Sequence, residues 1–258
     1  MSPRRQLAEV ILGRGDYSAG GACTQPFLDQ DGARRRRPMV MGEVLGNASG
    51  CEPVLAEMFS GRASDPVTWS VMWKEIGADG IVVRTAGMSP EDASALVSSV
   101  SDRTGLPVAV DGSEECISAC SSAVGNSTLM LIGDLDPESC GTHAVAVPVC
   151  SPDACGDAMP GRANRLFLVS GRFPQRRMFD VASSIRTRAL EGDEGCDAPI
   201  VFDVTGVWED GFQDARRASM VEAGAALTAM LSGADVLIVR GPGAADMARV
   251  YGEELADL

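Results

Sequence analysis

Two nearly identical stretches, GADGIVVR at 77–84 and GADVLIVR at 233–240, strongly constrain how this chain can fold. Each stretch begins with a glycine that can end a helix and continues into an apolar, β-branched segment that closes with an arginine. A chain that leaves a helix and enters a buried strand has this pattern. The two stretches therefore predict two equivalent steps of one repeated helix–strand unit.

Eight apolar segments along the chain have the character of buried strands. They span 38–45, 80–86, 106–112, 128–134, 143–149, 165–171, 199–206 and 235–241. Helical patterns with capping residues separate most of them, for example from Asp65 to Gly77 and from Ser89 to Gly105. The connections around the fourth to sixth segments are short.

Eight parallel strands that alternate with helices predict a closed TIM (β/α)8 barrel. In such a ring the second and eighth strands both flank the first, so the two GAD stretches begin equivalent steps on either side of the strand at 38–45. We expect one barrel domain over 38–258 and an N-terminal extension over 1–37. An open doubly wound sheet and a pair of smaller domains are the alternatives, because they share the same local patterns.

The charge of the chain narrows the choice of partners. Its 22 Lys and Arg against 36 Asp and Glu give a net charge of −14, which would repel nucleic acids and anionic membranes. The arginine run within 33–40 fits a solvated loop. No stretch approaches the roughly 20 apolar residues that a membrane span needs, and the N-terminus lacks the pattern of an export signal. We therefore expect a cytoplasmic protein.

Several residue types that often carry chemistry are scarce. Lys74 and His143 are the only lysine and histidine, so catalysis by either side chain has few candidates. No C-x-x-C pair occurs, and in a chain of this size the cysteines indicate reduced, buried thiols rather than disulfides, zinc or an iron–sulfur cluster. The eight cysteines are Cys23, Cys51, Cys116, Cys120, Cys140, Cys150, Cys155 and Cys196.

A TIM barrel places its functional site at the carboxyl ends of its strands. The residues that end the predicted strands are acids, arginines and small residues: Glu43, Arg84, Thr85, Asp111, Asp134, Ser151, Gly171, Asp203, Thr205, Arg240 and Gly241. Such a mouth can bind a polar ligand but contains no evident proton-transfer pair. Capping of the next helix is the commoner role for Asp111 and Asp134. The RGPG segment at 240–243 fits a phosphate-binding turn and a plain turn equally well.

The three tryptophans have different expected roles. Trp69 and Trp73 are four residues apart on one predicted helix, and we expect them to pack against the barrel. Trp208 follows the seventh predicted strand, where it can pack on a flat cofactor or on a partner protein.

Four segments carry a resemblance to a known family: QPFLDQDGARRRRPMVMGEV at 25–44, DPVTWSVMWKEIGADGIVVR at 65–84, IRTRALEGDEGCDAPIVFDVTGVWEDGFQDAR at 185–216 and LTAMLSGADVLIVRGPGAADMARVY at 227–251. Together they resemble the delta subunit of acetyl-CoA decarbonylase/synthase, which is also described as the small subunit of the corrinoid iron–sulfur protein. The chain would be a shortened, diverged member.

The resemblance implies a TIM barrel whose mouth faces cobalamin, held mainly by the corrinoid iron–sulfur large subunit, with the iron–sulfur cluster in that partner. It implies a subunit of the CO dehydrogenase/acetyl-CoA synthase complex in the one-carbon metabolism of methanogenesis. The chain would hold the corrinoid while a methyl group passes between a tetrahydropterin and acetyl-CoA synthase. A pterin methyltransferase and acetyl-CoA synthase would be further partners.

The implied cofactor-binding residues are Thr205, Trp208, Glu43 and Gly241, with Asp111 as a further polar strand end. Two alternatives remain. One is a stand-alone pterin-dependent methyltransferase that uses Asp111 and Asp203. The other is an unrelated barrel enzyme that binds phosphate through Gly241 and Gly243.

Overall fold

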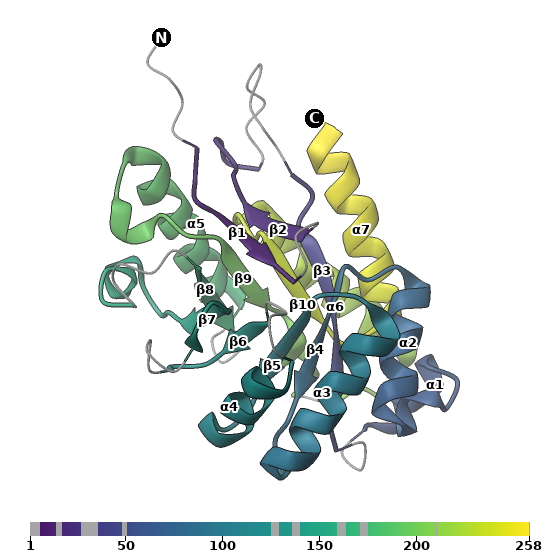
Figure 1. Ribbon diagram of the computed structural model, residues 1–258. Coiled ribbons are helices and arrows are strands. Elements are labelled where there is room, and N and C mark those ends of the chain that lie inside the picture. The colour runs from purple at the N-terminus through teal and green to yellow at the C-terminus, as the bar shows by residue number, and fades with distance from the viewer. Residues whose placement is uncertain are drawn as a thin grey trace.

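The computed structural model describes residues 6–13, 17–26, 36–47, 51–124, 129–135, 140–158, 164–170, 175–209 and 211–257 (Figure 1). Eight parallel strands close into a barrel in the order β10-β3-β4-β5-β6-β7-β8-β9. They are β3 (Met39–Leu45), β4 (Gly80–Arg84), β5 (Val108–Asp111), β6 (Met130–Ile132), β7 (Ala144–Pro148), β8 (Arg165–Ser170), β9 (Ile200–Asp203) and β10 (Val236–Val239). The predicted TIM (β/α)8 barrel is confirmed, and the open-sheet alternative is wrong.

Helices cover most of the barrel wall (Figure 1). They are α1 (Pro53–Met58), α2 (Pro66–Ile76), α3 (Pro90–Thr104), α4 (Glu114–Ala123), α5 (Gln175–Glu191), α6 (Ala215–Leu231) and α7 (Pro242–Asp257). In the described residues between β6 and β8 the connections hold no α-helix, and the short 3-10 helix η4 (Pro152–Cys155) packs there instead. The short connections expected around the fourth to sixth strands are therefore present.

The two GAD stretches build the same turn twice. Gly77 and Gly233 follow α2 and α6 with φ of 91° and 104°, which is the left-handed region where glycine is favoured. Three residues after Gly77 the chain enters β4, and three residues after Gly233 it enters β10. Because β4 and β10 both pair with β3, the two turns lie on either side of the same strand.

The aspartate of each turn fastens a neighbouring strand. Asp79 accepts a hydrogen bond of 2.8 Å from the N–H of Val40 at the start of β3. Asp235 accepts one of 2.8 Å from the N–H of Ile200 at the start of β9. Each of these strand-start donors gains a charged acceptor, so the repeated aspartates set the register at the amino end of the barrel.

An N-terminal hairpin, which we did not predict, closes that amino end. Strands β1 (Glu9–Leu12) and β2 (Tyr17–Gly20) pair antiparallel. Val10, Leu12 and Ala19 are buried with the apolar side chains of the barrel interior. The N–H of Ala8 donates to Asp197 Oδ1 at 2.7 Å, which ties the hairpin to the loop before β9. The division of the chain at residue 38 stays a prediction.

The packing of α2 shapes the barrel near its mouth. Trp69 and Trp73 are fully buried, and each meets Phe59 edge to face at ring distances of 5.4 and 5.1 Å. The indole of Trp73 lies on Gly42, where an added Cβ would come within 2.1 Å of the ring. That close approach lets Trp73 Nε1 donate to the backbone oxygen of Glu43 at 2.8 Å. The expected packing of both tryptophans is confirmed.

All eight cysteines are unbridged thiols, and five of them are buried. Burial raises the pKa of Cys120 to about 11 and that of Cys155 to about 12. Within the described parts of the chain, no helix combines the length and the apolar character that crossing a membrane requires.

Candidate functional site

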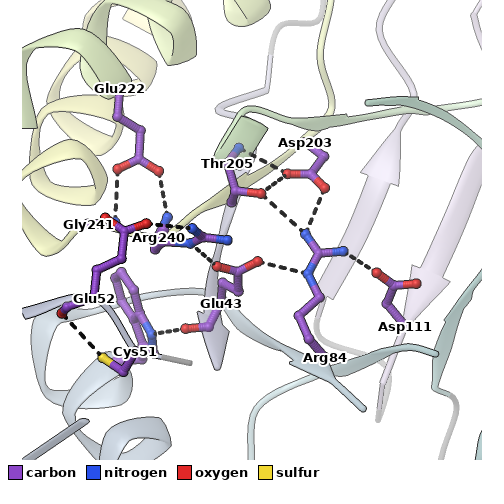
Figure 2. A network of polar contacts seen from close by, with 11 residues as sticks. Glu43, Cys51, Glu52, Arg84, Asp111, Asp203, Thr205, Glu222, Arg240 and Gly241 are labelled. Carbon is purple, nitrogen blue, oxygen red and sulfur yellow. Dashed lines mark hydrogen bonds and ion pairs between the residues drawn. The ribbon is translucent and has the colours of Figure 1, made fainter. Parts of the chain in front are cut away.

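The charged residues of the mouth occupy equivalent positions on five adjacent strands. Side chains alternate along a strand, and in each case an inward apolar residue is followed two positions later by a charged one. The five strands form the continuous arc β9-β10-β3-β4-β5 of the barrel. The inward charged residues are Glu43, Arg84, Asp111, Asp203 and Arg240, and Figure 2 shows them meeting in one network.

Arg84 lies at the centre of this network. Its Nε donates to Glu43 Oε1 at 2.8 Å and its Nη2 to Asp203 Oδ2 at 2.7 Å. Its Nη1 donates to Asp111 Oδ2. Burial alone would lower the pKa of Arg84, but the carboxylates of Asp203, Glu43 and Asp111 raise this pKa well above its usual value. The guanidinium therefore stays charged and holds three strand ends together.

Glu43 is shared between two arginines. Its side chain is 1% exposed, and its Oε2 accepts a hydrogen bond from Arg240 Nε while Arg84 occupies Oε1. Arg240 also lies over the ring of Trp208, 5.8 Å from the ring centroid. Both oxygens of Glu43 are thus occupied within the protein.

Both carboxylate oxygens of Asp203 are likewise occupied by hydrogen bonds within the protein. Its Oδ1 accepts from the N–H of Thr205 at 3.0 Å and from the Thr205 hydroxyl at 2.7 Å, and Arg84 occupies its other oxygen. Burial tends to raise the pKa of Asp203, but Arg84 and Thr205 outweigh it and lower this pKa below its usual value. Asp203 is an anion that serves to position Arg84.

Asp111 differs from the other two carboxylates. Its side chain is 36% exposed, compared with 12% for Asp203 and 1% for Glu43. Only Oδ2 contacts Arg84, and Oδ1 has no hydrogen bond within the described residues. The expectation that Asp111 caps the next helix is wrong, because Ser113 is the N-cap of α4. Asp111 is the acceptor of the network that remains open to a ligand.

Glu222, on α6, is a site residue that the sequence analysis missed. Its carboxylate is fully buried and accepts the N–H groups of Arg240 at 2.6 Å and Gly241 at 2.9 Å. Burial raises its pKa to about 7, against the lowering effect of the two N–H groups and of the Trp208 indole. An acid amid the small residues of the long helix α6 was the available signal.

Gly241 and Trp208 do not have the surfaces expected of cofactor-binding residues. The N–H of Gly241 already donates to Glu222, so it is unavailable to a phosphate or a cofactor. Trp208 is 1% exposed and packs edge to face on Phe212 at 5.2 Å. Its ring is part of the core and presents no flat face to the mouth. Thr205 is buried as well, and its hydroxyl is bonded to Asp203.

The other predicted strand-end residues lie outside the network in the described structure. Thr85 is buried and donates to the backbone oxygen of Asp111. Asp134 is exposed beyond β6, and Ser151 caps η4. Gly171 is outside the described residues. His143, before β7, accepts the N–H of Leu129 at 3.0 Å and so serves the opposite end of the barrel.

Fold and site together define a TIM (β/α)8 barrel with a polar, internally paired mouth. Its similarity to known proteins is structural: no family model matches the sequence, and no curated protein does. The dihydropteroate synthase of Yersinia pestis, solved with a sulfonamide drug, has a TM-score of 0.61 at 14% identity and covers 95% of this chain and 97% of its own.

Two further dihydropteroate synthases have the same fold. The protein of Xanthomonas albilineans, in complex with 7,8-dihydropteroate, has a TM-score of 0.59 at 16% identity and covers 86% of this chain and 95% of its own. The protein of Thermus thermophilus has a TM-score of 0.59 at 16% identity and covers 97% of this chain and 99% of its own. At these identities the shared property is the barrel.

The assignment to the corrinoid iron–sulfur protein is wrong. The similar solved structures compared above are dihydropteroate synthases. The predictions of cobalamin as a cofactor and of a role in CO dehydrogenase/acetyl-CoA synthase and methanogenesis rested on that assignment and are wrong as well. The reason is visible in the segments that suggested it, because their GAD turns and helix caps are devices of barrel construction. The partner subunits stay predictions, and no family assignment supports them.

Proposed function

We propose that this protein binds a pterin at the mouth of its barrel, with Asp111 as the acceptor for the heterocycle. The observation behind the proposal is the arrangement of three carboxylates around the planar Arg84 guanidinium. A pterin carries an amino group and a ring N–H side by side on one carbon, as a guanidinium does. A carboxylate that accepts hydrogen bonds from a guanidinium can therefore also accept them from this edge of a pterin.

Accessibility selects Asp111 among the three acids. Glu43 and Asp203 have both oxygens occupied and are largely buried, whereas Asp111 has a partly exposed side chain and one oxygen without a hydrogen bond to any described residue. A donor edge that enters the mouth reaches Asp111 first, and there it competes with Arg84 Nη1. Within the protein, Arg84 donates to Asp111 from the position that the donor groups of the ligand would take.

The opposite arc of the mouth supplies a less polar wall. By strand alternation, Pro148 of β7 and Ser170 of β8 occupy the positions that correspond to the charged residues of the other strands. Binding sites for small heterocycles combine such apolar lining with a few converging polar groups. The fold of dihydropteroate synthase, seen with 7,8-dihydropteroate in one solved structure, supports a pterin as the ligand class.

The nature of the site favours binding and orientation over proton transfer by histidine or lysine. His143 serves the amino end of the barrel, and Lys74 is exposed on α2. The phosphate alternative is disfavoured because Glu222 already accepts the N–H groups of Arg240 and Gly241. A cytoplasmic location, where reduced thiols persist, accords with the proposal.

The test is a calorimetric titration of the purified chain with 7,8-dihydropteroate. We expect saturable binding, and we expect Asp111→Asn to weaken it roughly 10-fold or more, since hydrogen bonds to charged groups contribute about 1.5–3 kcal/mol. Asp134→Asn is the matched control, because Asp134 is an exposed acid at the end of a neighbouring strand. Its affinity should stay within about twofold of the parent chain.

Two results would reject the proposal. One is the absence of binding by a chain whose thermal unfolding is cooperative. The other is equal loss of affinity in Asp111→Asn and Asp134→Asn, because binding would then depend on overall charge and not on the carboxylate at the mouth.

A further inference from the structure

We propose a second binding site, for a small oxyanion, at the amino end of the barrel and independent of pterin binding at the mouth. A pocket there is lined by Thr24, Arg36, Pro38, Arg186, Asp235 and Leu255, among others. It lies at the start of β10, whereas Arg240 of the mouth follows its end. Four strand residues at about 3.3 Å each separate the two sites by roughly 13 Å.

Two residues that line this pocket each have a buried polar atom without a hydrogen-bond partner among the described residues. The side chain of Arg186 is 2% exposed, and its Nη1 has no hydrogen-bond partner in the part of the chain that the structure describes. The Oγ1 of Thr24, a residue that is 5% exposed, has none either. Native proteins rarely leave such groups unpaired, and an unpaired charged donor is the costlier case. Both atoms therefore indicate a bound group that accepts hydrogen bonds.

The other terminal nitrogen of Arg186, Nη2, is held by two hydrogen bonds. Nη2 donates to Asp235 Oδ2 at 2.5 Å and to the backbone oxygen of Gly233. Asp235 in turn accepts the N–H of Ile200 at 2.8 Å. The guanidinium is thus fixed in place with Nη1 left over as a donor, which is a preorganised half of an anion site.

The charge of the lining favours an anion over a neutral acceptor. The charged residues of the lining are two cations, Arg36 and Arg186, and one carboxylate, that of Asp235, which is already bonded to Arg186 and to the N–H of Ile200. The lining therefore carries a net charge of +1 within a chain of −14. Arg36 is partly exposed and bonds Glu9 at 2.6 Å, so it stands where an anion would enter. The planar guanidinium suits phosphate and carboxylate oxygens alike.

The experiment measures binding of inorganic phosphate and of acetate by calorimetry, with chloride at equal ionic strength as the baseline. We expect one of the two to bind saturably, and the one that binds identifies the source of the oxyanion. Thr24→Val should weaken this binding roughly 10-fold, and Thr24→Ser should retain it because the hydroxyl is kept. Thr228→Val is the control, since Thr228 of α6 bonds Gly224 away from the pocket lining.

Thermal unfolding provides a second measurement. In chloride Thr24→Val should melt no lower than the parent chain, because an unpaired buried hydroxyl is lost. In the binding anion the parent chain should gain in melting temperature and the variant should gain less. Arg36→Gln, at the exposed rim, tests the same site without altering the core, and it should weaken binding severalfold.

Absence of binding by phosphate and acetate beyond the chloride baseline would overturn the proposal and leave water as the occupant. Equal affinity in the parent chain, Thr24→Val and Arg36→Gln would do the same. Asp111→Asn should leave anion binding unchanged, so failure at the mouth and failure at this pocket are told apart.

Discussion

Arg84 and Arg240 donate to opposite oxygens of one carboxylate, that of Glu43 (Figure 2). The two arginines end the two GAD stretches, and Glu43 lies on the strand between them. The repeat therefore acts at both ends of the barrel. Its aspartates bind strand starts at the amino end, and its arginines converge on a single acid at the mouth.

Removal of the central cation should be costly. We expect Arg84→Met to lower the free energy of unfolding by about 3–5 kcal/mol at pH 7, because Asp203 would be left as a buried charge without its arginine and Glu43 would keep only Arg240. The measurement is urea unfolding. The matched control is Arg62→Met, whose ion pair with Glu75 spans 3.7 Å with both side chains more than half exposed, and which should cost less than about 1 kcal/mol.

The deficit of Arg84→Met should shrink in acid. In the parent chain the lowered pKa of Asp203 adds stability above the ordinary aspartate pKa, and that contribution is lost as the pH falls through the lower folded value. In the variant the same acid prefers to be protonated, so its stability rises as the pH falls. A deficit that stays constant between pH 7 and pH 4 would show that lost packing, and not unpaired charge, is the cause.

Glu222 should make the protein less stable as the pH rises from about 4.5 to about 7. Burial raises its folded pKa to about 7 from 4.5, so the stability it contributes is complete below the unfolded pKa and is lost through the folded one. The full change is on the order of 3 kcal/mol. Glu222→Gln should remove this slope and should be less stable overall, because one backbone N–H loses its acceptor.

The measurement is the difference between the unfolding free energies of the parent chain and Glu222→Gln across that pH range. Glu57→Gln, at an exposed position of α1, should reproduce the parent profile. Parallel profiles for the parent chain and Glu222→Gln would contradict the raised pKa.

The two aspartates of the repeat offer an internal comparison. Asp235→Ala should cost about 3–5 kcal/mol, because Arg186 is 2% exposed and would lose its carboxylate. Asp79→Ala should cost about 1–2 kcal/mol, because Arg37 is 29% exposed and water can replace the lost partner. Chemical denaturation of both variants tests this order, and a larger loss in Asp79→Ala would refute it.

The barrel wall should open first between β6 and β8. Strand β6 has three residues, and no α-helix covers the described connections on either side of β7. Fewer buried contacts lower the free energy of local opening. Hydrogen exchange followed by mass spectrometry should therefore show faster exchange in β6 and β7 than in β3 and β4. Uniform protection around the ring would mean that the 3-10 segment seals the wall as well as a helix does.

The sequence predicted the barrel because eight buried strands and their helix caps are local patterns. It placed Glu43 and Asp111 at the mouth because strand ends can be located from hydrophobic runs. It did not predict which strand-end side chains would pair with one another and so be unavailable to a ligand, since that depends on the closure of the barrel. Glu222 and Trp208 show the same limit, because tertiary packing buries both of them and decides that Glu222 accepts the backbone N–H of Arg240.

The hairpin that closes the amino end imposes an order on the making of this protein. The hydrogen bond from the N–H of Ala8 to Asp197 cannot form until Asp197, 189 residues later in the chain, has been synthesised. At roughly 5–20 residues per second, a ribosome needs about 10 to 40 s to supply that partner. Val10 and Leu12, buried in the finished molecule, leave the ribosome long before the strands that cover them. This hairpin, synthesised before the barrel strands, is thus among the last segments that can find their place, and its apolar face is available to chaperones in the interval.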